Sequence, residues 1–171
     1  AEKRLGVPMD HVRAIAAAST GLLNRYNRFF GFLDPNKHAP PAAYYVARIR
    51  GAMAADCGTC VEIEFNLANQ AGVDAKVIAA ALQGDLDALG PQLGAVSRLT
   101  DAVVSNRIDD PDAREAVVAA YGEAGLIELS YAMNGAALLP GVKRTMGYAV
   151  ACDSTLMNRL KGTLDERILK S

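Results

Sequence analysis

The stretch that decides the fold runs from residue 42 to residue 84 and reads AAYYVARIRGAMAADCGTCVEIEFNLANQAGVDAKVIAAALQG. It contains no proline, and alanine, the residue with the highest helix propensity, recurs along its whole length. Nothing in it alternates apolar and polar residues with the period of two that a half-buried strand requires. The stretch therefore predicts consecutive helices, and we expect an all-α protein.

Capping residues divide this stretch into three helices. The first covers residues 42–55, and Asp56 is predicted to cap a second helix that carries Cys57 to Gln70 and stops at Gly72. Asp74 and Gly84 are suitable ends for a third, short helix.

The flanking segments also show the spacing of apolar residues that is typical of helices. The predicted elements are a first segment near residues 8–30, a proline-rich loop at residues 34–41, a helix after Gly90-Pro91 that includes Leu93, Val96, Leu99, Val103 and Val104, a helix from Asp110-Pro111 to Tyr121, an apolar helix after Gly122 and Gly125 that starts at Leu126, and a last helix after Pro140-Gly141 with Val142, Met146, Val150 and Met157 on one face. A chain of 171 residues without repeats predicts one domain, residues 1–171.

Charge and hydropathy exclude two classes of partner. The formal net charge is -1, so the chain lacks the positive field that attracts nucleic acid. The longest nearly apolar stretch, residues 126–139, is shorter than the roughly 20 residues that cross a bilayer, so no membrane association is expected. The first residues lack the pattern of a secretory signal, and we expect a cytoplasmic protein.

The candidate chemistry lies in Cys57 and Cys60, which form a C-x-x-C pair. On a helix, both point to the side that also carries Glu64, one turn further on. A cysteine in the first turn faces free backbone N–H groups, which lower its thiol pKa, and two close thiols can form a disulfide. Glu64 is then the natural proton acceptor for the pair.

Other interpretations of these residues remain open. Both cysteines are alternatively small apolar residues of an alanine-rich core, with Glu62 and Glu64 solvated. Zinc needs four ligands, and only Cys152, His11 and His38 remain to complete such a site, so we expect no metal and no cofactor. These three residues are interpreted as packed or solvated. Arg48 and Arg50 are expected to be solvated or interfacial ions; the alternative is that one of them attracts an anionic substrate toward the thiols.

The order of these motifs resembles a known family. The run DCGTCVEIEFNLANQAGVD at residues 56–74, the helix KVIAAAL that follows, and the later segment YGEAGLIEL at residues 121–129 are similar to the carboxymuconolactone decarboxylase and alkylhydroperoxidase D family. The resemblance implies a helical bundle with an N-terminal helix and loop at residues 1–40 and a family core at residues 41–160. It also implies a homo-oligomer, often a trimer or hexamer, that a dihydrolipoyl- or thioredoxin-like reductant recharges.

The family's redox site is carried over residue by residue. Cys60 resembles the cysteine that meets a peroxide, and Cys57 resembles the resolving cysteine, which is exposed to the reductant. At the positions where the family has a Glu and two His residues, this chain has Tyr45, Thr59 and Glu64. We expect Glu64 to replace the second His, with the Tyr45 hydroxyl as its partner, unless Tyr45 is simply a core aromatic residue.

The sequence therefore predicts an oxidoreductase whose catalytic residues are Cys60, Cys57, Glu64 and Tyr45. The predicted substrate is a peroxide or a small disulfide. Two alternatives stay open: a decarboxylase-type enzyme without redox chemistry, and a catalytically degenerate oligomer that serves as a binding module. Cysteines that do not react with peroxide would favour the binding module.

Overall fold

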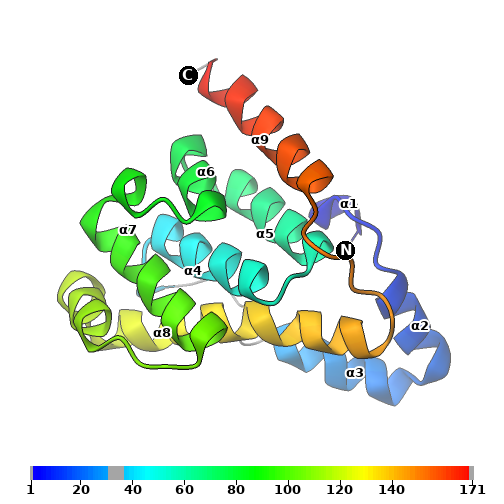
Figure 1. Cartoon of the computed structure of the whole chain (residues 1–171). Helices are drawn as coiled ribbons and strands as arrows, with labels where there is room; N and C mark the ends of the chain where they lie inside the picture. The colour runs from blue at the N-terminus through cyan, green and yellow to red at the C-terminus, as the bar shows by residue number, and fades with distance from the viewer. Residues whose placement is uncertain (1, 31–36, 170–171) are drawn as a thin grey trace.

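Helices joined by short turns and loops make up the part of the chain that the computed structural model describes, residues 2–30 and 37–169, and no strand occurs there (Figure 1). The predicted all-α class is confirmed. No described helix has both the length and the apolar composition needed to cross a membrane. The elements are α1 (Glu2–Leu5), α2 (Asp10–Ala18), α3 (Thr20–Arg28), α4 (Pro41–Ala54), α5 (Gly58–Gln70), α6 (Ala75–Gln83), α7 (Leu86–Thr100), the π-helix η2 (Asp101–Asn106), α8 (Pro111–Thr145) and α9 (Ser154–Ile168).

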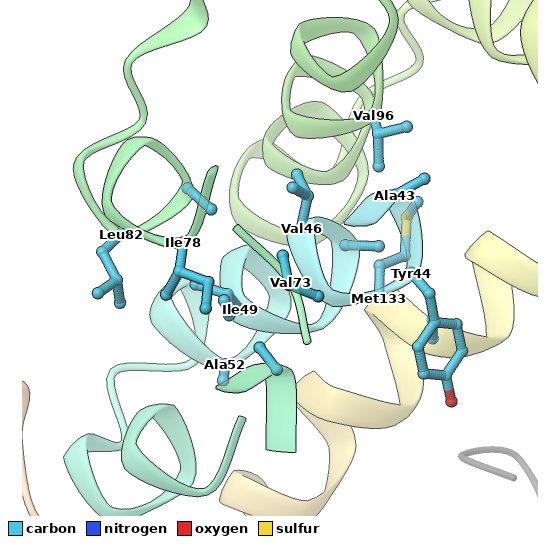
Figure 2. Packing of buried hydrophobic residues seen from close by; sticks show 14 of the residues in the cluster. Ala43, Tyr44, Val46, Ile49, Ala52, Val73, Ile78, Leu82, Val96 and Met133 are labelled. Atoms are coloured by element: carbon cyan, nitrogen blue, oxygen red, sulfur yellow. The ribbon is translucent and has the colours of Figure 1, made fainter. Parts of the chain in front are cut away.

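Helix α4 is the centre of the bundle, because it packs against α5, α6, α7, η2 and α8. Most of its residues are buried, which explains why its apolar residues are spread around the helix rather than confined to one stripe. Val46 and Ile49 of α4 lie among side chains of α6 and α7, such as Ile78 and Val96, whereas the Tyr44 ring points away from them (Figure 2). The side of α4 that carries Tyr44 therefore faces away from α6 and α7.

Gly51 allows α4 and α8 to approach closely. A Cβ atom built on Gly51 would lie 2.4 Å from the backbone carbonyl oxygen of Met133 in α8. Two backbones that touch in this way cannot adjust as a flexible side chain does.

We predict that Gly51→Ala lowers the free energy of unfolding by about 1–3 kcal/mol, because the added methyl group forces the two helices apart. Gly141→Ala is the matched control, since Gly141 also lies in α8 and a Cβ there meets nothing within 4 Å. The control should gain about 0.5–1 kcal/mol from the better helix propensity. Urea unfolding followed by circular dichroism measures both, and equal effects of the two substitutions would contradict the prediction.

Several predicted helix ends are confirmed. Asp74 accepts a hydrogen bond from the backbone N–H of Lys76, and Gly84 ends α6 in the left-handed conformation. Gly90 and Gly122 both have non-helical backbone angles, with φ of 70° and 71°, and they break α7 and α8 at the predicted positions. Positive φ favours glycine because a Cβ atom is strained there.

Other helix ends were predicted wrongly. The first segment contains two α-helices, α2 and α3, and Ser19 separates them by capping α3 with its hydroxyl. Pro140 does not end its helix, because α8 continues through Pro140 and Gly141 to Thr145. Residues 148–153 are not helical, so the predicted last helix does not exist as such, and α9 starts at Ser154.

The loop before α4 is fixed by an acidic side chain of α8. The Glu128 carboxylate accepts hydrogen bonds from the backbone N–H groups of Lys37, His38 and Ala39, at 2.7, 2.8 and 2.8 Å. Residues 34–36 of the predicted proline-rich loop lie outside the described residues, and residues 37–40 are not helical, as predicted. His38 is exposed here, so it is a solvated loop residue.

Candidate functional site

Cys57 and Cys60 lie at the first turn of α5. Cys57 is the N-cap residue, and its carbonyl oxygen accepts the backbone N–H groups of Cys60 and Val61, both at 2.9 Å. Asp56 was predicted as the cap, but it lies one residue earlier in the left-handed region, with φ of 46°. Both cysteines are free thiols.

The turn that carries Cys57 is covered by the chain between α8 and α9. The Asp56 carboxylate accepts the backbone N–H of Cys152 at 2.9 Å, and the N–H of Gly58 donates to the carbonyl oxygen of Val150 at 2.7 Å. Cys57 is consequently fully buried, with 0% of its surface exposed. The family resemblance implies that Cys57 is exposed to the reductant. This expectation is wrong for the structure, because Cys57 is buried.

A cavity of about 580 Å³ lies beside Cys60, between the N-terminal helices, α4, α5 and α8. This volume is within the range of roughly 300–1,000 Å³ that small-molecule sites occupy. Cys60 lines the cavity, and Cys57 is not among the lining residues. Much of the wall is apolar, from side chains that include Leu5, Met9, Val12, Ile63, Leu67 and Leu139.

A buried cation contacts the Cys60 sulfur. Nζ of Lys143, in the last turn of α8, lies 3.7 Å from the Sγ atom of Cys60. Lys143 is only 3% exposed, and it lines the cavity as well. An ammonium group at this distance stabilises a thiolate, because little water is present to screen the two charges.

The two sulfur atoms share one negative charge. The pKa of Cys57 is lowered to about 6, first because its thiolate accepts a hydrogen bond from the Cys60 thiol, and further because Lys143 and Arg144 are positive. The pKa of Cys60 is raised, by that same hydrogen bond and by burial. At neutral pH the pair is therefore singly ionised and titrates as one unit.

Glu64 lines the same cavity, but its carboxylate forms an ion pair with a second buried cation. Its Oε2 and Oε1 atoms lie 2.6 Å from Nε and 2.8 Å from Nη2 of Arg48 in α4. The Tyr44 hydroxyl lies 3.2 Å from Nη1 of the same guanidinium. Arg48 was expected to be solvated or interfacial, and that prediction is wrong, because its side chain is only 7% exposed. Arg50, by contrast, forms a half-buried ion pair with Asp101.

The N-terminal helices bring a histidine and a tyrosine to the cavity. Nε2 of His11 in α2 lies 2.9 Å from the Tyr26 hydroxyl in α3, and both residues are buried. The pKa of His11 is lowered to about 4 by burial and by the charge of Lys143, so the imidazole is neutral at pH 7. Burial and the neighbouring Cys60 raise the pKa of Tyr26 to about 12.

The remaining predicted residues are placed as follows. Tyr45 lines the cavity with its ring 5.8 Å from the Arg48 guanidinium, but the hydroxyl that contacts this guanidinium belongs to Tyr44. Thr59 does not line the cavity. Cys152 is half-buried, and burial and Asp56 raise its pKa to about 11. In the described part of the chain, no three His, Cys, Asp or Glu side chains are arranged to hold a metal ion.

Sequence reasoning missed Lys143, His11 and Tyr26 as parts of the site. Lys143 lies 83 positions from Cys60 in the chain, so no local spacing connects the two. Tyr44 and Arg48 did leave a signal, because they are four residues apart on one face of a largely apolar helix. A charge within such an alanine-rich segment indicates a buried partner.

Comparisons of the chain with protein-family models, with curated proteins and with solved structures find no match. The fold and the site geometry define an all-α protein with two buried free cysteines, one of which, Cys60, lines a cavity.

Proposed function

We propose that this protein is a thiol oxidoreductase that reduces a peroxide or a small disulfide with Cys60 and Cys57. The observation that carries the proposal is the position of Cys60, which lines the cavity while in contact with the buried ammonium group of Lys143. Perturbed titratable groups in a cavity mark functional sites more often than chance. The resemblance to alkylhydroperoxidase D points to the same chemistry.

The reaction with a peroxide balances on these two sulfur atoms. The Cys60 thiolate attacks one peroxide oxygen, the O–O bond breaks, and an alcohol or water leaves while Cys60 becomes a sulfenic acid. Cys57 then attacks the Cys60 sulfur, which releases water and forms the disulfide. Two thiols lose two electrons, and the peroxide gains them. A dithiol reductant, of the dihydrolipoyl or thioredoxin type, returns both thiols by disulfide exchange.

In this proposal the two cysteines have different roles, and the burial of Cys57 supports the distinction. Because Cys57 does not line the cavity, a substrate in the cavity meets Cys60 first. Cys57, which is buried next to Cys60 outside the cavity wall, supplies the second thiol. Glu64 does not act as the proton acceptor in this proposal, since its carboxylate forms an ion pair with Arg48.

The proposal is tested by the stoichiometry of oxidation. We predict that one equivalent of hydrogen peroxide or cumene hydroperoxide converts the reduced protein to one Cys57–Cys60 disulfide, identified by peptide mapping after alkylation. Oxidised lipoamide in place of peroxide tests the disulfide substrate by the same readout. Cysteines that stay reduced with all three compounds would contradict the proposal and favour the non-enzymatic binding module.

A further inference from the structure

The contact between Lys143 and Cys60 provides more than a favourable charge for a thiolate. We infer that the Lys143 ammonium group is the acid that protonates the leaving oxygen when Cys60 attacks a peroxide. The inference rests on the proposed function, of which it specifies one step and one residue.

A proton is needed at that step because an alkoxide is a poor leaving group at neutral pH. A positioned acid that protonates it in the transition state contributes about 10²–10⁴-fold to the rate. The peroxide bond that breaks lies next to the attacking sulfur, and Nζ of Lys143 is 3.7 Å from that sulfur. The ammonium group is therefore within reach of the oxygen on which charge develops.

The charged side chains on the α4 side of the cavity do not serve as this acid. Glu64 forms an ion pair with Arg48 and has no proton to give. The guanidinium of Arg48 does not lose a proton in proteins at ordinary pH. The two side chains instead stabilise each other's charge within the largely apolar wall.

The polar side chains of the N-terminal helices do not supply this proton either. His11 is a neutral imidazole, with its pKa lowered to about 4 by burial and by Lys143. Tyr26 holds its proton tightly, because burial and the charge of Cys60 raise its pKa to about 12. Lys143, whose Nζ atom lies 3.7 Å from the Cys60 Sγ atom at the cavity wall, is thus the acid assigned to this step.

The protons and charges of the reaction balance when Lys143 acts as this acid. The resting site holds one thiolate, one thiol and one ammonium group, and the thiol proton of Cys60 moves to Cys57 as Cys60 attacks. Lys143 gives a proton to the leaving alkoxide and becomes a neutral amine, and an alcohol leaves. The Cys57 thiol then gives its proton to the hydroxyl group displaced from the sulfenic acid, so that water leaves and the disulfide forms. Solvent returns the proton to the amine.

The experiment compares two oxidants that differ in their need for an acid. We predict that Lys143→Met slows oxidation by tert-butyl hydroperoxide, whose leaving group is an alkoxide, about 100-fold more than oxidation by peracetic acid, whose leaving group is acetate. Thiolate absorbance near 240 nm, measured on the same samples, corrects both rates for any loss of thiolate. The ratio of the two rates in one sample does not depend on the fraction of folded protein.

Two further variants sharpen the comparison. Lys143→Arg keeps the positive charge but has no proton to give, so we predict the same selective loss with tert-butyl hydroperoxide while the thiolate is retained. Lys76→Met is the matched control, because Lys76 is exposed on α6 and does not line the cavity. An equal loss with both oxidants in Lys143→Met would overturn the inference and leave the proposed function standing. A wild-type protein that reacts with neither oxidant would overturn both.

Discussion

Replacing Arg48 with methionine is expected to lower the free energy of unfolding by about 3–5 kcal/mol. The guanidinium and the Glu64 carboxylate are 7% and 6% exposed, and they are joined through two contacts of 2.6 and 2.8 Å. Without Arg48, the buried Glu64 carboxylate loses the cation that pairs with it directly. Urea unfolding followed by circular dichroism measures the loss.

Two matched variants identify burial as the cause. Arg98→Met removes an ion pair with Asp110 whose arginine is 47% exposed, and it should cost only about 0–1 kcal/mol. The double variant Arg48→Met with Glu64→Met should recover most of the loss, because two apolar residues of similar length replace the whole pair. A cost for Arg48→Met no larger than that for Arg98→Met would show that the pair is hydrated.

Serine substitutions at the two cysteines are expected to stop the reaction with peroxide at different stages. Cys60→Ser should abolish the fast oxidation, because Cys57 does not line the cavity. Cys57→Ser should still react once, but its product should be a Cys60 sulfenic acid, because the thiol that forms the disulfide is missing. Trapping with dimedone followed by mass spectrometry detects that sulfenic acid.

Cys152→Ser is the control for this pair of variants. Cys152 is half-buried, and its pKa is raised to about 11, so it carries little thiolate at neutral pH. We expect its substitution to leave both the rate and the product unchanged. Fast oxidation that persists in Cys60→Ser, or that disappears in Cys152→Ser, would contradict the assigned roles.

Local sequence signals predicted the helices well where side chains adjacent in the chain fix the end. Asp74 and Gly84 bound α6 as expected, and Gly90 and Gly122 break their helices. The continuation of α8 through Pro140 was not predictable from local rules, because a proline usually ends a helix. Tertiary packing, against α4 above all, supports α8.

The candidate site was predicted in part, for a related reason. The shared face of Cys60 and Glu64 follows from their spacing on one helix, and both side chains do line the cavity. The arginine that pairs with Glu64 and the ammonium group beside Cys60 come from other helices, α4 and α8. Such contacts depend on how helices pack, which one sequence does not encode in any local spacing.

The most direct test of a reactive dithiol at this cavity is the second-order rate constant for oxidation of the reduced protein by cumene hydroperoxide, measured as a function of pH. Because the pKa of Cys57 is lowered to about 6, the thiolate of the pair is present above this pH and lost below it. We predict a rate at pH 7 well above that of free cysteine, falling as the pH drops through about 6. A rate equal to that of free cysteine, still rising toward its ordinary pKa of about 8.5, would contradict a redox function for Cys57 and Cys60.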